Sequence, residues 1–361
     1  MNKSKSILCS LGDQKIDESI FKQIIDVIRL KVTDKYDYPP VVIKCKGSII
    51  GTIGNFSATV GKPKSKKTYN VTAEVSAALS GKPILNYEVT LPPDKQKILY
   101  VDTEQGRYHC HKVLQRIMKL AGLPLDKDCA RIEFLVLREF TPEQRRDIIS
   151  HYLSEDPEIG LLIIDGVRDL VKDINNSTEA LEVMNDLMRW SSYYNLHLQT
   201  VLHLNKGDDN TRGHIGTELN NKAETVLQIT KCRDQPNMSE VRVMHIRDKE
   251  FQPFAFYINQ EGLPELVNNY DAPSKSTKVS FVQWEDEQHR TAIEMAIGEN
   301  KPLGYTEMLE TLTKGYTQYG YARGRCTMVS LMKELIKRKL IIKNGKNYIY
   351  NDDHSDDDTS D

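Results

Sequence analysis

The run GKPKSKKT, residues 61–68, contains the residue types that hold phosphate groups. In a phosphate loop of the pattern G-x-x-x-x-G-K-S/T, backbone N–H groups wrap the phosphates, the lysine offsets their charge, and the hydroxyl binds Mg²⁺. Gly61, Lys67 and Thr68 match this pattern in type and spacing. We therefore predict contacts of these residues with ATP and Mg²⁺. By adjacency alone, the prediction extends to Lys64, Ser65 and Tyr69.

Lys66 stands where the pattern has its second glycine. That position normally takes a small residue, because the backbone there approaches phosphate closely and adopts dihedral angles that glycine tolerates. Taken alone, the run is better explained as a lysine-rich surface turn. The interpretation as a nucleotide site therefore depends on residues elsewhere in the chain.

Three further stretches place polar groups directly after apolar runs. Asp102 and Glu104 follow ILYV, Asp165 follows GLLII, and His203 follows LQTVL. A site that hydrolyses a nucleoside triphosphate needs a carboxylate for Mg²⁺, a second one that polarises the attacking water, and a polar group near the γ-phosphate. Singly, Asp165 could start a turn, Glu104 could cap a helix, and His203 could be a core histidine. Their shared position after apolar runs favours one nucleotide site.

The elements that must position these residues follow from the apolar pattern. Amphipathic helix patterns alternate with near-continuous apolar strands, which is typical of an α/β fold with a parallel sheet covered on both faces. Ligands bind such sheets at the carboxyl ends of the strands. Three later strands without intervening helices predict an antiparallel extension at one edge. The expected helices are 67–80, 108–121, 141–153 and 176–194, and the expected strands are 97–102, 131–137, 160–165, 198–203, 223–230, 240–246 and 254–258.

The chain resembles the RecA-like P-loop ATPases of the RepA type, relatives of the hexameric helicases, which plasmids and bacterial mobile elements carry. The matching pieces are GKPKSKKT, YVDTEQG, LLIIDG, VLHLNKGDDNTRGHIGTEL and VRVMHIRDKEF. The resemblance implies a RecA-like sheet flanked by helices, with ATP and Mg²⁺ as ligands and DNA as a partner. It also implies roles for Lys67 and Thr68 in the phosphate loop, Glu104 as catalytic base, Asp165 with Thr68 at the metal, and His203 as γ-phosphate sensor.

Two further expectations depend on the same resemblance. The polar segment 205–225 is expected to be a loop that faces DNA in the central channel of a ring, although a surface loop fits its composition equally well. Arg247 is expected to reach a neighbour's γ-phosphate as an arginine finger, with an ordinary salt bridge at the sheet edge as the alternative. The basic members of the loop are Lys206, Arg212, His214 and Lys222.

A smaller domain is expected after the polar linker DAPSKSTK. Three helix patterns precede LIIKNGKNYIY, in which Asn344-Gly345 predicts a tight hairpin turn, and this order indicates a winged helix. Its third helix and hairpin would contact DNA phosphates, whereas the alternative is a solvated helix face or a subunit contact. The basic residues predicted to contact DNA here are Arg323, Arg325, Lys337, Arg338 and Lys343.

The domain boundaries follow from these patterns. We predict an N-terminal extension at 1–38 that carries one amphipathic helix, a RecA-like ATPase domain at 39–270, and a winged-helix domain at 271–350. The acidic tail at 351–361 has no apolar anchor and is expected to be disordered.

The composition narrows the remaining choices. The formal net charge is −2, so contact with DNA must come from local basic patches. The six cysteines have no CxxC pair or metal-ligand spacing, which fits a reducing compartment. No apolar run approaches the roughly 18 residues of a membrane span. We therefore expect a cytoplasmic protein without membrane contact.

Two functions fit these observations. The first is an ATP-hydrolysing DNA-processing protein, either a helicase-like motor or a replication or mobilisation accessory of a mobile element, which forms a homo-oligomer such as a hexamer. The second is a DNA-binding regulator or transposition accessory whose nucleotide site acts as a switch or is degenerate. DNA-stimulated ATPase activity separates them, because a motor requires it. A metabolic P-loop kinase is disfavoured, since it would need an arginine-rich lid and has no use for a winged helix.

Overall fold

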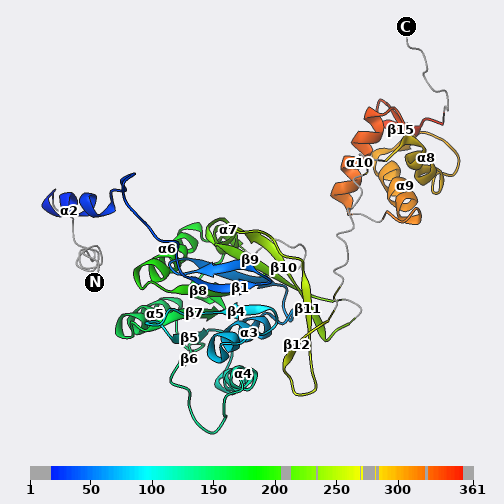
Figure 1. Cartoon of the computed structure of the whole chain (residues 1–361). Helices are drawn as coiled ribbons and strands as arrows, with labels where there is room; N and C mark the ends of the chain where they lie inside the picture. The colour runs from blue at the N-terminus through cyan, green and yellow to red at the C-terminus, as the bar shows by residue number, and fades with distance from the viewer. Residues whose placement is uncertain are drawn as a thin grey trace. The chain divides into compact units, whose positions relative to one another are not determined.

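The computed structural model divides into two compact units, Met1–Ala272 and Pro273–Asp361, and each is considered by itself (Figure 1). The structure describes residues 18–204, 213–232, 235–268, 270, 281, 284–321 and 324–352. Among these residues, no helix is both long enough and apolar enough to cross a bilayer.

The first unit is built around one large, mostly parallel sheet. Its strands are β3 (Phe56–Gly61), β5 (Lys97–Asp102), β6 (Ile132–Val136), β7 (Ile159–Asp165), β8 (His197–His203), β9 (Thr225–Lys231), β10 (Met238–Ile246), β11 (Phe254–Ile258) and β12 (Pro264–Leu266). Across the sheet they stand in the order β12-β11-β10-β9-β3-β8-β7-β5-β6. From β9 to β6 all neighbours are parallel, and β10, β11 and β12 are antiparallel. The predicted parallel sheet with an antiparallel extension is therefore confirmed.

Helices cover both faces of this sheet (Figure 1). In β7, Leu161 and Ile163 belong to one hydrophobic core, whereas Leu162 and Ile164 belong to the other. This two-sided burial explains why the strand sequences are almost continuously apolar. The first core includes α3 (Lys67–Ser80), α4 (Arg107–Leu120) and a small sheet of β1 (Val41–Cys45), β2 (Ser48–Thr52) and β4 (Tyr87–Val89), and the second includes α5 (Pro142–Glu155), the short 3₁₀ helix η1 (Val167–Leu170), α6 (Ser177–Tyr193) and α7 (Gly213–Lys222).

The helix α7 corrects one expectation. The polar composition of the segment 205–225 predicts a loop, but Gly213–Lys222 is helical. Ile215 and Leu219, four residues apart, are buried in the same core as α6, and this contact stabilises a helix whose other residues are polar. The predicted DNA contacts Lys206 and Arg212 lie outside the described residues.

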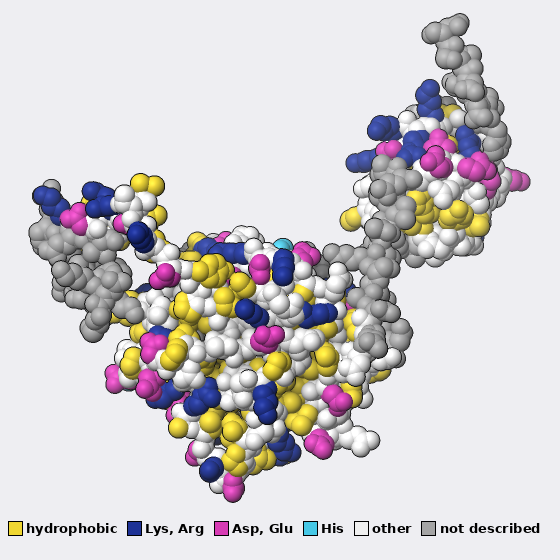
Figure 2. Space-filling model, in the orientation of Figure 1, with side chains coloured by type: hydrophobic (Ala, Val, Ile, Leu, Met, Phe, Trp, Pro, Cys, Tyr) yellow, Lys and Arg dark blue, Asp and Glu magenta, His cyan; other side chains and the backbone are white. Residues whose placement is uncertain are grey.

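The N-terminal extension contains the helix α2 (Glu18–Ile28). Its apolar residues Phe21, Ile25 and Ile28 are exposed, at 49%, 42% and 65%. Further large apolar side chains are exposed along the following segment up to Tyr38, and Figure 2 shows hydrophobic side chains on this surface. The extension therefore presents an apolar surface that the described residues do not cover.

The second unit has its own core. It contains α8 (Asp286–Glu294), β13 (Leu303–Gly304), α9 (Tyr305–Gln318), α10 (Arg325–Lys337), β14 (Ile341–Asn344) and β15 (Asn347–Tyr350). Side chains such as Trp284, Leu312 and Leu331 pack together between these elements. The predicted hairpin is present, but its turn residues are Gly345 and Lys346, one residue later than the predicted Asn344-Gly345, because Asn344 still pairs with Asn347. Gly345 takes the left-handed conformation there, with a φ of 60°. The order of elements agrees with the expected one, and membership of the winged-helix class stays a prediction.

Candidate nucleotide-binding site

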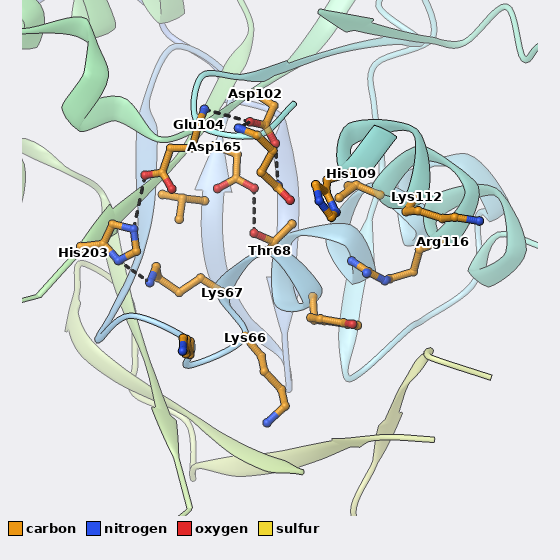
Figure 3. A pocket seen from close by; sticks show the side chains of 15 residues that line it. Lys66, Lys67, Thr68, Asp102, Glu104, His109, Lys112, Arg116, Asp165 and His203 are labelled. Atoms are coloured by element: carbon orange, nitrogen blue, oxygen red, sulfur yellow. Dashed lines mark hydrogen bonds and ion pairs between the residues drawn. The ribbon is translucent and has the colours of Figure 1, made fainter. Parts of the chain in front are cut away.

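Four strand ends meet at the carboxyl edge of the parallel sheet. Asp102 at the end of β5 pairs with Asp165 at the end of β7, and Asp165 pairs with Val201 of β8. His203 at the end of β8 pairs with Gly61 at the end of β3. The register therefore brings together the residues that the sequence places after separate apolar strands (Figure 3).

The phosphate loop links β3 to α3. A Cβ atom at Gly61 would overlap Ser65 Oγ and the carbonyl oxygen of Ile229, so only glycine fits there. Lys66 has a φ of 69° and a ψ of 33°, the left-handed conformation for which the motif normally uses glycine. This backbone costs a non-glycine residue about 1–2 kcal/mol. The loop thus accommodates the departure at Lys66 without losing its turn.

The ammonium of Lys67 is buried at the centre of the site. Its Nζ donates to the carbonyl oxygens of Gly61 at 3.0 Å and Lys62 at 3.2 Å, and it lies 3.0 Å from His203 Nδ1. Burial lowers the pKa of Lys67 to about 8, although Asp165 and Glu104 act in the opposite direction. An anion at the loop would restore the charged form.

The side chains of Thr68 and Asp165 bring two oxygen atoms together next to the phosphate loop. Thr68 Oγ1 donates to Asp165 Oδ2 at 2.9 Å, and the Tyr100 hydroxyl donates to the same oxygen at 3.0 Å. Burial, reinforced by the charge of Asp102, raises the pKa of Asp165 to about 6. Hydroxyl and carboxylate oxygens are the ligands that Mg²⁺ takes beside phosphate, so these residues fit the ion.

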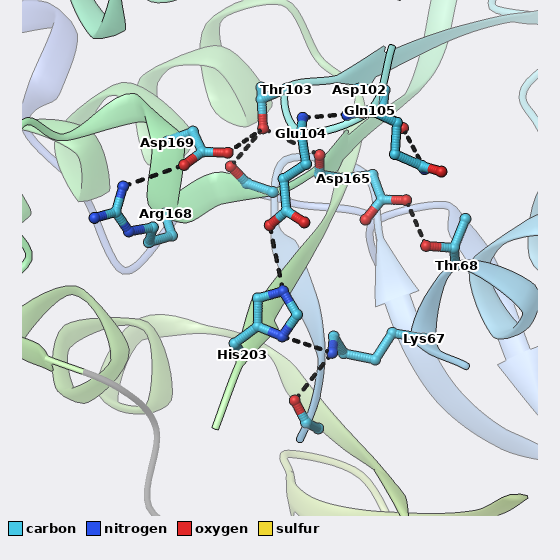
Figure 4. Close-up of polar contacts among 12 residues, drawn as sticks. Lys67, Thr68, Asp102, Thr103, Glu104, Gln105, Asp165, Arg168, Asp169 and His203 are labelled. Carbon is cyan, nitrogen blue, oxygen red and sulfur yellow. Dashed lines mark hydrogen bonds and ion pairs between the residues drawn. The ribbon is translucent and has the colours of Figure 1, made fainter. Parts of the chain in front are cut away.

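Glu104 faces the cavity and remains accessible to solvent. Its Oε1 lies 3.3 Å from His203 Nε2, and this hydrogen bond lowers the pKa of Glu104. When His203 Nδ1 accepts from the Lys67 ammonium, Nε2 carries the proton and donates to Glu104. Figure 4 shows the resulting chain of hydrogen bonds from Lys67 through His203 to Glu104.

Asp102 has a different task from Glu104. Its Oδ1 accepts the N–H groups of Glu104 at 3.0 Å and Gln105 at 2.7 Å, and its Oδ2 accepts the Gln105 amide at 2.7 Å (Figure 4). Thr103 Oγ1 donates to the carbonyl oxygen of Gly166 at 2.9 Å and so ties the same turn to the end of β7. Asp102 therefore holds the turn that presents Glu104.

The helix α4 forms one wall of the site, which the sequence did not predict. A cavity of about 430 Å³ lies over the loop, and α4 contributes His109, Lys112 and Arg116 to its lining. The Arg116 guanidinium lies 3.6 Å from the centre of the Tyr69 ring. The signal in the sequence is the spacing of three and then four residues, which puts these side chains on one face of a helix. Of the predicted nucleotide contacts, Lys64, Lys67, Thr68 and Tyr69 also line the cavity.

The other two predicted nucleotide contacts, Gly61 and Ser65, are not among the residues that line the cavity. Ser65 is 2% exposed, and its Oγ has no hydrogen-bond partner within the described part of the chain. A buried hydroxyl without a partner is unfavourable, so a phosphate oxygen near this loop would satisfy it. This observation fits the prediction that Ser65 contacts the nucleotide.

Arg247 lies at the opposite ends of the strands from the phosphate loop, beside the start of β9. Because β10 is antiparallel, its last residue Ile246 pairs with Thr225 at the start of β9. The backbone N–H of Arg247 donates to the carbonyl oxygen of Glu224 at 3.1 Å. Arg247 is therefore remote from the phosphate loop of its own chain, and an arginine finger at this position would have to serve another copy.

The predicted DNA contacts fall in both units, and each unit is considered by itself. On α7, His214 is exposed and Lys222 pairs with Glu218 at 3.2 Å. In the second unit Arg325, Lys337 and Lys343 are exposed, and Figure 2 shows Lys and Arg side chains gathered over α10. Arg323 lies outside the described residues.

Among the predicted DNA contacts, Arg338 is held by hydrogen bonds within the second unit. Its guanidinium donates to the Trp284 carbonyl oxygen at 2.7 Å, to Asp286 Oδ1 at 3.0 Å and to Glu334 Oε1 at 3.1 Å. These bonds tie the end of α10 to the start of α8. The Arg338 side chain therefore stabilises the fold of the second unit. The residue type alone does not reveal this role, because an arginine that contacts phosphate looks the same in the sequence.

Comparison with known proteins supports a P-loop ATPase domain in this part of the chain. Residues 46–209 match a family model described as an AAA domain. The matched segment is less than half of the chain, and it contains the phosphate loop, Glu104, Asp165 and His203.

Two further comparisons add less. No protein of curated function matches the sequence. Among solved structures, the crystal structure of the RadB recombinase matches with a TM-score of 0.42 and 16% identity, over 58% of this chain and 90% of that one. A likeness at this level carries no argument about function.

Proposed function

We propose that this protein binds ATP with Mg²⁺ at the phosphate loop and hydrolyses it as a RecA-like ATPase. The observation that carries the proposal is the convergence of Lys67, Thr68, Glu104, Asp165 and His203 on one edge of the parallel sheet. The match of the same segment to the AAA domain model supports it independently.

The residues divide the chemistry between them. Thr68 Oγ1 and the Asp165 carboxylate would hold Mg²⁺, which when bound supplies positive charge at the phosphates. Lys67 releases its loop carbonyls and donates to phosphate oxygens. Glu104, accessible to water, orients the attacking water and accepts its proton.

The hydrogen-bond chain suggests how binding prepares the base. In the structure, Lys67 and Glu104 are both bonded to His203. When Lys67 turns to phosphate, His203 Nδ1 loses its donor and the imidazole is free to reorient. Nucleotide binding thereby changes the hydrogen bond that occupies Glu104, and the base becomes available once substrate is present.

We further propose a DNA-processing role in a homo-oligomer, either as a helicase-like motor or as a replication or mobilisation accessory of a mobile element. The exposed basic side chains of the second unit support contact with DNA, and the exposed apolar face of α2 supports assembly. The position of Arg247 at the far edge of the sheet also fits a site completed by a neighbour. A hexamer and a winged-helix contact with duplex DNA belong to this proposal.

The test is ATP hydrolysis by the wild-type protein with Mg²⁺ or EDTA, and with or without single-stranded DNA. We expect hydrolysis that requires Mg²⁺ and rises with DNA. Nucleotide binding without DNA-stimulated hydrolysis would instead favour the alternative, a DNA-binding regulator with a nucleotide switch. Absence of any nucleotide binding would contradict both the ATPase and the nucleotide switch, and would favour a DNA-binding regulator with a degenerate site.

A further inference from the structure

Lys66 connects the phosphate loop to the turn between β9 and β10. Its Nζ donates to the carbonyl oxygen of Pro236 at 2.9 Å and lies 3.5 Å from Ser239 Oγ. The same side chain lines the cavity over the loop. Figure 3 shows it extending from the start of α3, away from Thr68.

The ammonium of Lys66 has neutral partners. Within the residues that the structure describes, no carboxylate forms an ion pair with it. Lys231 contributes a positive charge nearby, whereas Cys232 acts on the pKa of Lys66 in the opposite direction. Burial and Lys231 both lower the pKa of Lys66. A partly buried cation held by a carbonyl and a hydroxyl gains more from an anion than from either of them.

The backbone places this cation where an anion would arrive. The left-handed conformation of Lys66 keeps the turn of the phosphate loop, so its Cα lies where the motif brings the backbone close to phosphate. The lysine stem is flexible and its ammonium acts as a point charge. Nζ can therefore exchange one partner for another while the loop stays in place.

We propose that Lys66 is a second phosphate-binding lysine, whose Nζ exchanges the Pro236 carbonyl oxygen for a phosphate oxygen of the bound nucleotide and so releases the turn between β9 and β10. This inference rests on the proposed function, because it requires a nucleotide at the loop. Among the described residues, the hydrogen bonds from Met238 N–H to the Gln235 carbonyl oxygen at 2.9 Å and from Cys232 N–H to the Met238 carbonyl oxygen at 3.1 Å remain, and the hydrogen bond from Lys66 to Pro236 is lost.

The change of hydrogen-bond partner at Lys66 has a consequence for the sheet. The strand β10 starts at this turn and ends one residue before Arg247 at the opposite edge. Nucleotide occupancy at one edge thus changes the constraint on a strand that leads directly to the other.

The experiment uses the full chain with Lys66→Met, which removes the charge, keeps the stem and leaves a non-glycine residue at the left-handed position. Lys62→Met is the matched control, because it removes a charge from the same loop and its side chain does not line the cavity. The affinity for a non-hydrolysable ATP analogue is measured by calorimetry. Hydrogen exchange is followed in peptides that contain Met238 and Ser239, with and without the analogue.

We expect Lys66→Met to weaken binding about tenfold, or about 1.4 kcal/mol, and Lys62→Met to stay within about twofold. In wild type the analogue should speed exchange at Met238 and Ser239. In the Lys66→Met variant, hydrogen exchange at Met238 and Ser239 should already be fast without the analogue, and the analogue should not change it. Lys66→Arg, which keeps the charge, should bind within about threefold of wild type.

Three outcomes would overturn the inference. Unchanged affinity in Lys66→Met would exclude contact with phosphate, and unchanged exchange in wild type on binding would exclude release of the turn. Failure of wild type to bind any nucleotide would overturn the proposed function first. In that case, equal exchange of the ligand-free wild type and Lys66→Met would show separately that the Pro236 contact does not hold the turn.

Discussion

The ammonium of Lys67 and the carboxylate of Asp165 both lie in surroundings that disfavour their charge. Burial lowers the pKa of the first to about 8 and raises that of the second to about 6. Active sites accumulate such groups, because the charge is needed only when a ligand is present. A cation beside Asp165 and an anion beside Lys67 would each favour the charged form of these side chains.

The pKa of Lys67 predicts a pH dependence of binding. Above about pH 8 the amine of the empty site is increasingly neutral, so binding of ATP must take up a proton. The affinity should then fall by up to about tenfold for each pH unit. The Lys67→Arg variant keeps its charge and should show no such fall. Titration with an ATP analogue between pH 7 and 9.5 measures both, and parallel curves would remove Lys67 from the phosphate site.

The division of labour between the two acidic residues after β5 predicts different defects. Glu104→Gln should reduce hydrolysis by about 10²–10⁴-fold and leave nucleotide affinity nearly unchanged, since a general base acts in the transition state. Asp102→Asn should instead weaken the turn that it caps and lower the melting temperature. Turnover, affinity and melting are measured for both variants. If Asp102→Asn alone abolished turnover, the base would be wrongly assigned.

The raised pKa of Asp165 predicts that removing its charge stabilises the folded protein and abolishes its function. Its folded pKa of about 6 lies above the ordinary value of 3.8, so the native state binds more protons in this interval and stability falls as pH rises through it. At pH 7 Asp165→Asn should raise the melting temperature of the empty protein by a few degrees and abolish Mg²⁺-dependent nucleotide binding.

The control is Asp186→Asn, which changes another buried aspartate. Asp186 pairs with Arg146 at 2.6 Å and Arg189 at 2.9 Å, so its loss should lower the melting temperature. Equal shifts in the two variants would show that burial at Asp165 is not the cause.

At the scale of elements, periodic apolar patterns were sufficient for the large sheet and insufficient for α7. The strands carry nearly every position in a core, so each one is visible by itself. In α7 only Ile215 and Leu219, with the small Gly216, are buried, and the helix exists because α6 offers a surface to pack on. Contacts between distant segments decide such an element, and the local sequence does not contain them.

The same limit applies to the site. The strand ends predicted Glu104, Asp165 and His203, because parallel strands must bring their carboxyl ends together. The α4 wall was not predicted, since which face of a helix turns toward a cavity depends on its packing. Arg338 shows the converse, because its basic type suggested DNA and its acceptors lie within the fold.

The second unit should fold as a fragment from about residue 275 to residue 350, because its core is its own. If it contacts DNA phosphates, the fragment should bind duplex DNA with an affinity that falls steeply as salt rises. Changing Lys337 and Lys343 to Glu should weaken binding to all sequences alike. Arg338→Met should lower its melting temperature and spare DNA binding at low temperature. A folded fragment without DNA binding at low salt would make this unit an assembly element.

At the scale of the whole molecule, the two edges of the large sheet carry different halves of the proposed reaction. The cavity lies at the carboxyl edge and Arg247 at the opposite one. If Arg247 completes a neighbour's site, activity per subunit should rise with protein concentration, and Arg247→Ala should remove that rise. Turnover across a dilution series measures this. Constant specific activity in wild type would show that the site is complete within one chain.

If Arg247 acts on a neighbour as proposed, its placement opposite the cavity would make each copy both a donor and a recipient, joined head to tail. An Arg247→Ala copy keeps a sound cavity and fails its neighbour, whereas a Lys67→Ala copy fails itself and still lends its arginine. Each variant alone is inactive, yet a mixed assembly contains interfaces that combine the intact half of each. In an equal, random mixture about a quarter of the interfaces are of this kind. Two dead preparations should therefore complement one another when combined.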